Sequence, residues 1–278
     1  MEGDVLIRAV AQLGRAPGSG PGGRGFKSHQ PDLSVIPLRH HIAPLESPVL
    51  SSPDSALTKS AHTDQILDLM SKLVDYRRQE VRKRMEKVWQ KGSMLHIDVL
   101  LLIYHFAKVC SGNILEVGPY LGGSTIAAAF GARESNTRKK IVSIEGGGQL
   151  EHPRIPSRNI IKDLKRNLAR FGVVDDVTLI EGRSSNEATK SAVRQILGSG
   201  EVGLFMFDAD RNPRRDLDSF GDLLVDHCWV VIDDYFGPGR KAAPIRAQVD
   251  EMVSTGRLLT LGYYGWSTWI GQWQSCAD

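Results

Sequence analysis

Polar side chains follow five short apolar runs in this 278-residue sequence, and several of them could bind a ligand or accept a proton. Carboxylates can act as general bases, accept hydroxyl protons or bind a divalent cation. If the runs are parallel strands, their carboxyl ends meet at one edge of a sheet, where α/β proteins bind ligands. Each polar residue could instead cap a helix. The candidates are Glu116, Glu145, Ser184-Ser185, Asp208-Ala209-Asp210-Arg211 and Asp233-Asp234.

The segment Asn113–Thr125, with the sequence N-I-L-E-V-G-P-Y-L-G-G-S-T, predicts a strand, a glycine-rich turn and the start of a helix. Gly118, Gly122 and Gly123 would let a ligand lie against the main chain at the helix N-terminus. The segment lacks the Lys-Ser/Thr ending of a phosphate-binding P-loop and the G-x-G-x-x-G of a dinucleotide site. Its pattern is E-x-G-x-x-x-G. A glycine turn in another kind of α/β protein is the alternative.

Three of the carboxylates, Asp208, Asp233 and Asp234, should converge from adjacent strand ends. Clustered carboxylates repel one another unless a positive charge lies between them, and Mg²⁺ bound by oxygen ligands is a common solution. Arg211 offers another, since a guanidinium could pair with the cluster without a metal. Because arginine stays protonated, Arg211 cannot be a conventional general base, but it could stabilise an oxyanion. Asp210 or solvent could then accept the proton of a metal-bound hydroxyl.

The elements that must position these residues are predicted from alternating apolar runs and amphipathic segments. They favour an α/β fold with a doubly wound, mostly parallel sheet, helices on both faces and extra N-terminal helices. Strands are expected over 114–117, 141–145, 177–180, 203–207, 229–232, 258–264 and 267–273, the last two joined as a hairpin through Gly265. Helices are expected over 94–109, 160–168, 187–197, 217–224 and 243–253, preceded by one long or two consecutive helices over 66–89.

Residues 1–58 differ in composition from the rest of the chain. The stretch 15–25 is rich in glycine and proline, and 47–55 is rich in serine and proline, so neither can bury a core. Residues 10–31 also resemble the peptide obtained when a bacterial transfer-RNA gene is translated. We therefore expect 1–58 to be either a disordered arm or a mis-annotated extension, and 59–278 to be one domain with N-terminal helices at 61–109.

Composition narrows the function classes. Hydrophobic residues make up 41% of the chain, and the formal charge of +3 is spread among acids, which favours neither nucleic-acid nor membrane binding. The three cysteines are widely separated, so a disulfide framework or zinc site is not indicated, and a reduced cytoplasmic protein is expected. No apolar run approaches the roughly eighteen residues of a membrane span.

The glycine segment resembles that of class I S-adenosylmethionine-dependent methyltransferases. Its E-x-G-x-Y-x-G-x-S spacing is close to that of catechol O-methyltransferase and is reproduced by Glu116, Gly118, Tyr120, Gly122 and Ser124. The Asp208-Ala209-Asp210-Arg211 segment is similar to the D-A-D-K of caffeoyl-CoA O-methyltransferases, and Asp233-Asp234 matches the D-N or D-D pair of their metal site. The resemblance extends from about Lys91 to the C-terminus.

This resemblance implies a seven-stranded, Rossmann-like methyltransferase fold, S-adenosyl-L-methionine as cofactor, and Mg²⁺ or another divalent cation. It implies that Ser124 meets the methionine carboxylate, Glu145 the ribose, and Ser184 and Ser185 the adenine. Glu116, Gly118, Tyr120, Gly122 and Asp208 complete the expected cofactor site, Asp208, Asp233 and Asp234 the metal site, and Asp208, Asp210 and Arg211 the catalytic group. One departure is Arg211, which stands where the family has a lysine or histidine base.

The sequence thus predicts methyl transfer to a hydroxyl of a small molecule, assisted by a divalent metal. Two alternatives stay open: a metal-independent N- or C-methyltransferase, and a non-catalytic α/β protein that binds a nucleoside. A homodimer is also consistent with the sequence. The acceptor itself is not identified.

Overall fold

The computed structural model describes residues 53–275 of the chain, with side chains from Ser60 onward. The extension expected over 1–58 lies outside the described residues except for 53–58. Those six residues begin the first helix, α2 (Pro53–Arg77), which therefore starts earlier than the predicted boundary of the N-terminal helices.

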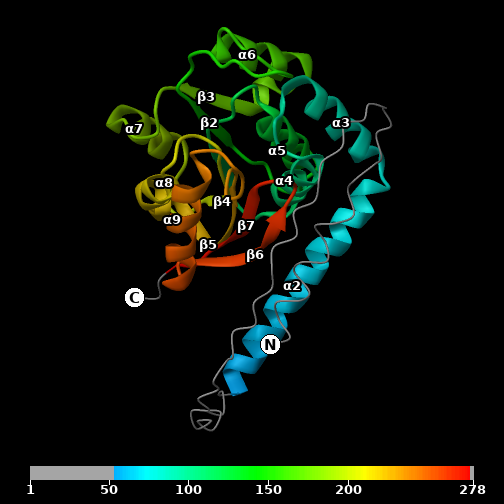
Figure 1. The fold of residues 1–278 in the computed structure, drawn as a ribbon, viewed down its shortest axis with the longest axis vertical. Coiled ribbons are helices and arrows are strands. Elements are labelled where there is room, and N and C mark those ends of the chain that lie inside the picture. The colour runs from blue at the N-terminus through cyan, green and yellow to red at the C-terminus, as the bar shows by residue number, and fades with distance from the viewer. Residues whose placement is uncertain (1–52, 276–278) are drawn as a thin grey trace, which may run out of the picture. The chain divides into compact units, whose positions relative to one another are not determined.

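A seven-stranded sheet lies at the centre of the described chain (Figure 1). Its strands are β1 (Asn113–Val117), β2 (Ile141–Glu145), β3 (Val177–Glu181), β4 (Val202–Phe207), β5 (Leu224–Ile232), β6 (Leu258–Tyr264) and β7 (Thr268–Trp273). Their order is β3-β2-β1-β4-β5-β7-β6; β1 to β5 are parallel, and β7 is antiparallel to both neighbours. The strand order switches at β1: β2 and β3 lie on one side of it, and β4 and β5 on the other. Sheets of this kind form a ligand crevice at such a switch point, here between β1 and β4. The predicted doubly wound fold is confirmed.

Helices cover both faces of the sheet (Figure 1). Successive strand residues point to opposite faces, so Ile114 and Met206 join one apolar cluster and Leu115 and Phe205 the other. The first cluster packs under α3 (Glu80–Gly92), α4 (Ile97–Val109), α5 (Gly123–Arg133) and α6 (Ile160–Arg170). The second packs under α7 (Glu187–Ile196), α8 (Pro213–Phe220) and α9 (Ala242–Ser254).

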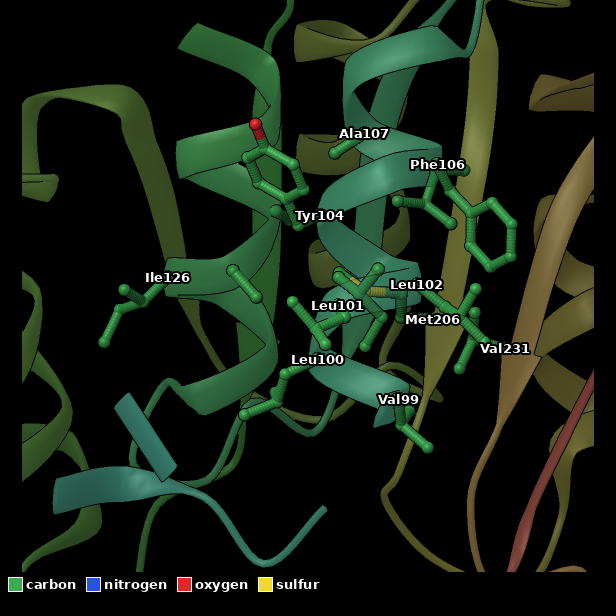
Figure 2. Packing of buried hydrophobic residues seen from close by; sticks show 14 of the residues in the cluster. Val99, Leu100, Leu101, Leu102, Tyr104, Phe106, Ala107, Ile126, Met206 and Val231 are labelled. Carbon is green, nitrogen blue, oxygen red and sulfur yellow. The ribbon is translucent and has the colours of Figure 1, made fainter. Parts of the chain in front are cut away.

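Helix α4 is apolar almost all round, and it is buried between α5 and the sheet (Figure 2). The Phe106 ring stacks on Trp229 of β5, with ring centroids 4.4 Å apart. Helix α5 approaches α4 closely because Gly131 has no side chain: a Cβ there would lie 2.1 Å from the Tyr104 carbonyl oxygen. Within residues 53–275 no single helix is long and apolar enough to span a membrane; α3 and α4 meet that test only together, across a 117° bend.

Three predicted elements have different bounds in the structure. The helical pattern over 66–89 forms two consecutive helices, one of the two predicted alternatives, with a break at Arg78-Gln79 and with outer bounds extended to 53 and 92. Helix α8 begins at Pro213 instead of 217, since the Asn212 side chain accepts the Arg215 N–H and caps it. Strand β5 begins at Leu224 instead of 229, across an irregular register that places His227 inside the strand with φ 58°.

Two short 3₁₀ helices, η2 (Val174–Asp176) and η3 (Gly221–Leu223), lead into β3 and β5.

Most of the basic side chains over residues 77–84 form ion pairs within the protein. Arg77 pairs with Asp98 of α4, and Arg84 with Glu134. Ion pairs within α3 join Arg82 to Glu86 and Lys83 to Glu80. These basic side chains are therefore paired with carboxylates of the protein itself.

Candidate active site

The predicted glycine turn joins β1 to α5 and packs against the end of β4. Gly118, Tyr120 and Gly122 all adopt left-handed backbone conformations, with φ of 86°, 52° and 87°. A Cβ on Gly118 would lie 2.3 Å from the Asp208 carbonyl oxygen. The turn therefore depends on glycine at this position, and it brings the start of α5 to the carboxyl ends of β1 and β4.

Glu116 is a buried organising residue of this turn, with only 2% of its surface exposed. Its carboxylate accepts hydrogen bonds from the hydroxyls of Ser124, Thr125 (2.5 Å) and Ser143 (2.7 Å). Burial raises the pKa of Glu116, and these hydroxyls oppose that effect. A ligand carboxylate at Ser124 must therefore compete with Glu116 for the hydroxyl proton or bind a backbone N–H.

Glu145 ends β2 beside the same turn and is also buried. Its two carboxylate oxygens accept the N–H groups of Tyr120 (3.1 Å) and Gly147 (2.8 Å). Burial raises the pKa of Glu145, and the backbone N–H groups lower it in part. Each oxygen keeps a further lone pair, so the carboxylate can still accept hydroxyl protons from a ligand.

A pocket of about 570 Å³ opens beside Glu145. It is lined by Gly146, Gly147, Gly148, Gln149, Arg158, Asn159, Ile161 and Glu181. Neither Ser184 nor Ser185 belongs to this lining. Ser184 is buried and accepts a hydrogen bond from Arg215 (3.3 Å), while Ser185 is exposed. The structure thus does not bring the two serines into this pocket, and the Gly146-Gly147-Gly148 run was the sequence signal for its lining.

The three carboxylates predicted to converge do so. One side-chain oxygen from each of Asp208, Asp233 and Asp234 lies within 4.8 Å of the others, and all three residues are partly buried. The parallel register of β4 and β5 pairs Phe207 with Ile232, which sets Asp208 beside Asp233. Asp234 follows with a left-handed φ of 59°.

Hydrogen bonds and burial define the chemistry of this carboxylate cluster. Asp233 Oδ1 accepts the hydroxyls of Ser267 (2.9 Å) and Thr268 (2.6 Å). Burial, followed by the nearby charge of Asp233, raises the pKa of Asp208 well above its ordinary value. A cation bound among the three would remove this repulsion, and the all-oxygen donor set fits a hard divalent ion such as Mg²⁺.

A small cavity on the α4 side of the sheet connects the glycine turn to the carboxylate cluster. Its polar wall is made by Glu116, Ser124, Asp208 and Asp233. Its apolar wall contains Leu95, Ile103, Met206, Phe207 and Val231. Residues from three strand ends (β1, β4 and β5) and from helices α4 and α5, far apart in the sequence, thus meet at this cavity.

Asp210 and Arg211 do not join this cavity lining. Asp210 is exposed and pairs with Arg215 (2.7 Å). Partial burial by itself would raise the pKa of Asp210. Hydrogen bonds from Arg215 and the Asn212 N–H outweigh this effect and hold the pKa of Asp210 below its ordinary value, which makes Asp210 a poor proton acceptor. The exposed Arg211 side chain forms no ion pair within the described part of the chain.

Lys241 supplies the cation that sequence reasoning assigned to Arg211. Its Nζ lies 3.4 Å from Asp234 Oδ2 and donates a 2.8 Å hydrogen bond to the Ala209 carbonyl. Lys241 follows Asp234 by seven residues, in a Gly-Pro-Gly loop that gave no sign of turning back toward the cluster.

Aromatic side chains lie at the β5 and β6–β7 ends of the site. Tyr235, Phe236 and Tyr263 form a cluster with ring centroids 4.7 to 5.0 Å apart. Phe236, Tyr263 and Trp266 are exposed, whereas Trp269 is fully buried in the core. The Tyr235 N–H donates to the Ser267 carbonyl (2.8 Å), which ties this aromatic rim to the residue that holds Asp233.

Comparisons with known proteins agree with the fold described above. A family model for a methyltransferase domain matches residues 115–235. No curated protein matches the sequence. A Klebsiella pneumoniae structure with a provisional O-methyltransferase name has a TM-score of 0.50 and 18% identity, covering 71% of this chain and 91% of its own. Cofactor-bound Rv0187 from MTB has a TM-score of 0.50 and 16% identity, covering 83% of this chain and 100% of its own. At such identities the likeness shows the fold.

Proposed function

We propose that this protein transfers a methyl group from S-adenosyl-L-methionine to a hydroxyl of a small molecule, assisted by a divalent cation. Two findings support this: residues 115–235 match a family model for a methyltransferase domain, and the seven-stranded sheet has the class I methyltransferase fold. The observation that carries the proposal is the single cavity in which Glu116 and Ser124 of the glycine turn meet Asp208 and Asp233. Because this cavity measures only about 10 Å³, the sulfonium methyl and the acceptor oxygen would be held beside it, next to Asp208 and Asp233. Such positioning supplies much of the acceleration in a bimolecular displacement.

The cofactor would span the carboxyl ends of β1 and β2. Glu145 has free lone pairs for the two ribose hydroxyls, and the neighbouring pocket of about 570 Å³ is large enough for the nucleoside base. The methionine end would lie toward Ser124 and Asp208. Glu116 holds the N-terminus of α5 in place through Ser124 and Thr125, so the turn is organised before the cofactor binds.

Asp208, Asp233 and Asp234 would hold the metal. A divalent cation bound there would lower the pKa of the acceptor hydroxyl and stabilise the charge that develops on its oxygen. Ser267 and Thr268 fix the Asp233 carboxylate through hydrogen bonds to one oxygen, which leaves the other oxygen available to a cation. The exposed rings of Phe236 and Tyr263 pack against Tyr235, the residue after Asp234, and offer the acceptor an apolar surface near these carboxylates.

A metal-independent methyltransferase is the second candidate, and Lys241 favours it. Its ammonium already lies between the Ala209 carbonyl and Asp234, where it offsets part of the negative charge. In that case the acceptor would be oriented by the protein alone.

Thermal stability with S-adenosylhomocysteine, measured after chelation and again with added Mg²⁺, separates these functions. We expect S-adenosylhomocysteine to raise the Tm, because a ligand that binds only the folded state stabilises it. Mg²⁺ should raise it further. A shift with S-adenosylhomocysteine that Mg²⁺ leaves unchanged would favour the metal-independent enzyme. If S-adenosylhomocysteine gives no shift and no binding heat, cofactor binding by this site is disproved.

Glu145 provides a pH-dependent test of the cofactor site. Its carboxylate should accept ribose hydroxyl protons only when ionised, and burial raises its pKa. S-adenosylhomocysteine affinity should therefore be full at pH 8 and fall with acidification, starting at a higher pH than an exposed glutamate would give. Glu145→Ala should weaken binding by about 2 kcal/mol, the range for hydrogen bonds to a charged group.

Calorimetry between pH 8 and pH 5 measures both effects. Glu145→Gln should bind weakly at every pH, because it has no titrating group. Glu151→Gln, an exposed residue of the same loop, is the matched control and should behave as the wild type does. Unchanged affinity in Glu145→Ala would contradict the ribose assignment.

A further inference from the structure

Lys241 bridges the two loops that carry the carboxylate cluster. Its Nζ donates to the carbonyl of Ala209, the residue after Asp208, and lies 3.4 Å from Asp234 Oδ2. These contacts join the end of β4 to the end of β5 from a third element, the start of α9. Within the described residues, the ion pairs of the cluster include no other lysine or arginine.

Lysine is an unfavourable residue at the helix position that Lys241 occupies. It is the N-cap residue of α9, has an αR backbone, and makes no side-chain capping bond. The first turn of α9 contains no acidic residue to compensate. A cation at a helix N-terminus is disfavoured by the helix dipole, and good N-caps are Ser, Thr, Asp or Asn. Residues that break a local rule in this way are expected at functional sites.

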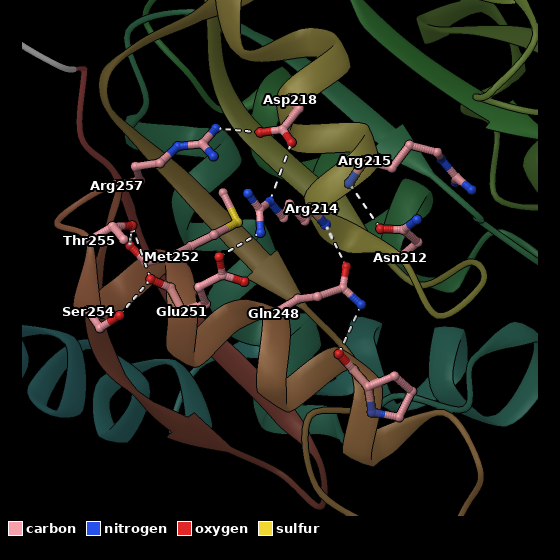
Figure 3. Close-up of polar contacts among 11 residues, drawn as sticks. Asn212, Arg214, Arg215, Asp218, Gln248, Glu251, Met252, Ser254, Thr255 and Arg257 are labelled. Carbon is pink, nitrogen blue, oxygen red and sulfur yellow. Dashed lines mark hydrogen bonds and ion pairs between the residues drawn. The ribbon is translucent and has the colours of Figure 1, made fainter.

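The frame behind Lys241 is well fixed. Gln248 of α9 donates to the Pro244 carbonyl (2.9 Å) and the Arg211 carbonyl (2.8 Å), and accepts the Arg214 N–H (3.3 Å). Figure 3 shows the hydrogen bond between Arg214 and Gln248 beside the ion pair of Arg214 with Glu251 (2.7 Å). Helix α9, which Lys241 precedes, is thus tied to α8 and to the segment that follows β4.

Charge decides what Lys241 does there. Three carboxylates face one ammonium, so the cluster keeps net negative charge and attracts a second cation. Lys241 pairs with Oδ2 of Asp234, a carboxylate oxygen that could also bind a metal. We propose that Lys241 is a resident counter-cation of the carboxylate cluster: it holds the β4 and β5 loops together before a metal binds, and competes with the metal for Asp234. This inference rests on the metal-assisted function proposed above.

The competition has a measurable consequence. Removing the ammonium should tighten metal binding, because the metal no longer displaces a cation from Asp234. About 43% of the Lys241 side chain and 38% of that of Asp234 is exposed, so solvent screens the pair. We therefore expect a gain of about fivefold in Mn²⁺ affinity for Lys241→Met.

The experiment uses the full chain saturated with S-adenosylhomocysteine, with free and bound Mn²⁺ measured by electron paramagnetic resonance. Lys241→Met should bind Mn²⁺ about fivefold more tightly than the wild type, and Lys241→Arg, which keeps the charge, should stay close to it. Lys87→Met removes an exposed lysine of α3 and is the matched control, with no change expected. Without metal, Lys241→Met should melt below the wild type, and Mn²⁺ should restore more of its Tm.

The outcomes separate this inference from the function on which it rests. Wild type and Lys241→Met binding Mn²⁺ equally, or Lys241→Met binding it more weakly, would overturn the competition and leave the metal site intact. Mn²⁺ binding by Lys241→Met alone would support the counter-cation and show that lysine replaces the metal in the wild type. If neither protein binds Mn²⁺ while both bind S-adenosylhomocysteine, the metal site and the competition are both wrong, but cofactor binding stands.

Discussion

Asp233→Asn is expected to lower Mg²⁺-dependent methyl transfer by on the order of a thousandfold, the scale seen when a group that stabilises transition-state charge is removed. The amide oxygen of asparagine can still accept the Ser267 and Thr268 hydroxyls, so the loop should keep its shape. What is lost is the negative charge that would bind the cation. Asp234→Asn should behave similarly, and both should keep most of their affinity for S-adenosylhomocysteine.

Asp208→Asn should weaken metal and cofactor binding together, because Asp208 also lies beside Ser124 in the shared cavity. Initial rates with Mg²⁺ and after chelation, together with S-adenosylhomocysteine calorimetry, measure the two effects separately. Asp226→Asn is the matched control, since it lies on β5 away from the carboxylate cluster and is exposed.

The melting temperature shows whether such a loss reflects unfolding. Burial raises the pKa of Asp233, so at neutral pH its ionised form is less stable in the folded protein than in the unfolded chain. Removing the charge should therefore keep or raise the Tm measured without metal. If the variants are inactive only because they unfold, or if turnover survives exhaustive chelation, the metal assignment fails and an ionic cluster replaces it.

Gly118→Ala is the second substitution with a large expected effect. Its left-handed φ of 86° costs an alanine about 1–2 kcal/mol. The new Cβ would also lie 2.3 Å from the Asp208 carbonyl oxygen, and overpacking costs about 1–3 kcal/mol more. We expect a loss of about 3 kcal/mol in the free energy of unfolding, and loss of S-adenosylhomocysteine binding, because the turn and the carboxylate loop move apart.

Alanine substitutions at two other glycines separate the cost of the left-handed backbone from the cost of the close contact. Gly172→Ala has a similar φ of 67° but no atom within 4 Å of its Cβ, so only the backbone cost should appear. Gly239→Ala has open space and no left-handed backbone, so it should be nearly neutral. Urea unfolding of the three variants measures the series. Equal losses for Gly118→Ala and Gly172→Ala would show that the close approach to Asp208 carries no cost.

Local patterns in the sequence were enough to predict the frame of this protein. The strand, turn and helix over 113–125 follow from an apolar run, glycines and a helix start, all contained within thirteen residues. The carboxylates at the ends of β4 and β5 were expected to converge because parallel neighbours end at one sheet edge, and side-chain oxygens of Asp208, Asp233 and Asp234 do lie within 4.8 Å of one another. The hairpin through Gly265 was predicted for the same kind of local reason.

Bounds failed where a tertiary contact overrides the local pattern. The first part of β5 contains the exposed residues Asp226 and His227, which do not look like a buried strand. They extend the strand only because β4 lies alongside it, through the pairing of Val202 with Leu224. Helix α8 is a different case, because no tertiary contact is involved. It begins early since Asn212 and Pro213 together start it, a local cap signal that apolar periodicity does not contain.

The direction of the polar side chains was decided by the tertiary structure alone. Arg211 occupies the sequence position of the expected base but lies exposed, because Arg215 of α8 pairs with Asp210 and Lys241 of α9 reaches the cluster instead. Spacing along a chain fixes which residues follow a strand, since that depends on the backbone period. Which charged group meets which carboxylate depends on how the helices pack around the sheet, and only the folded chain contains that information.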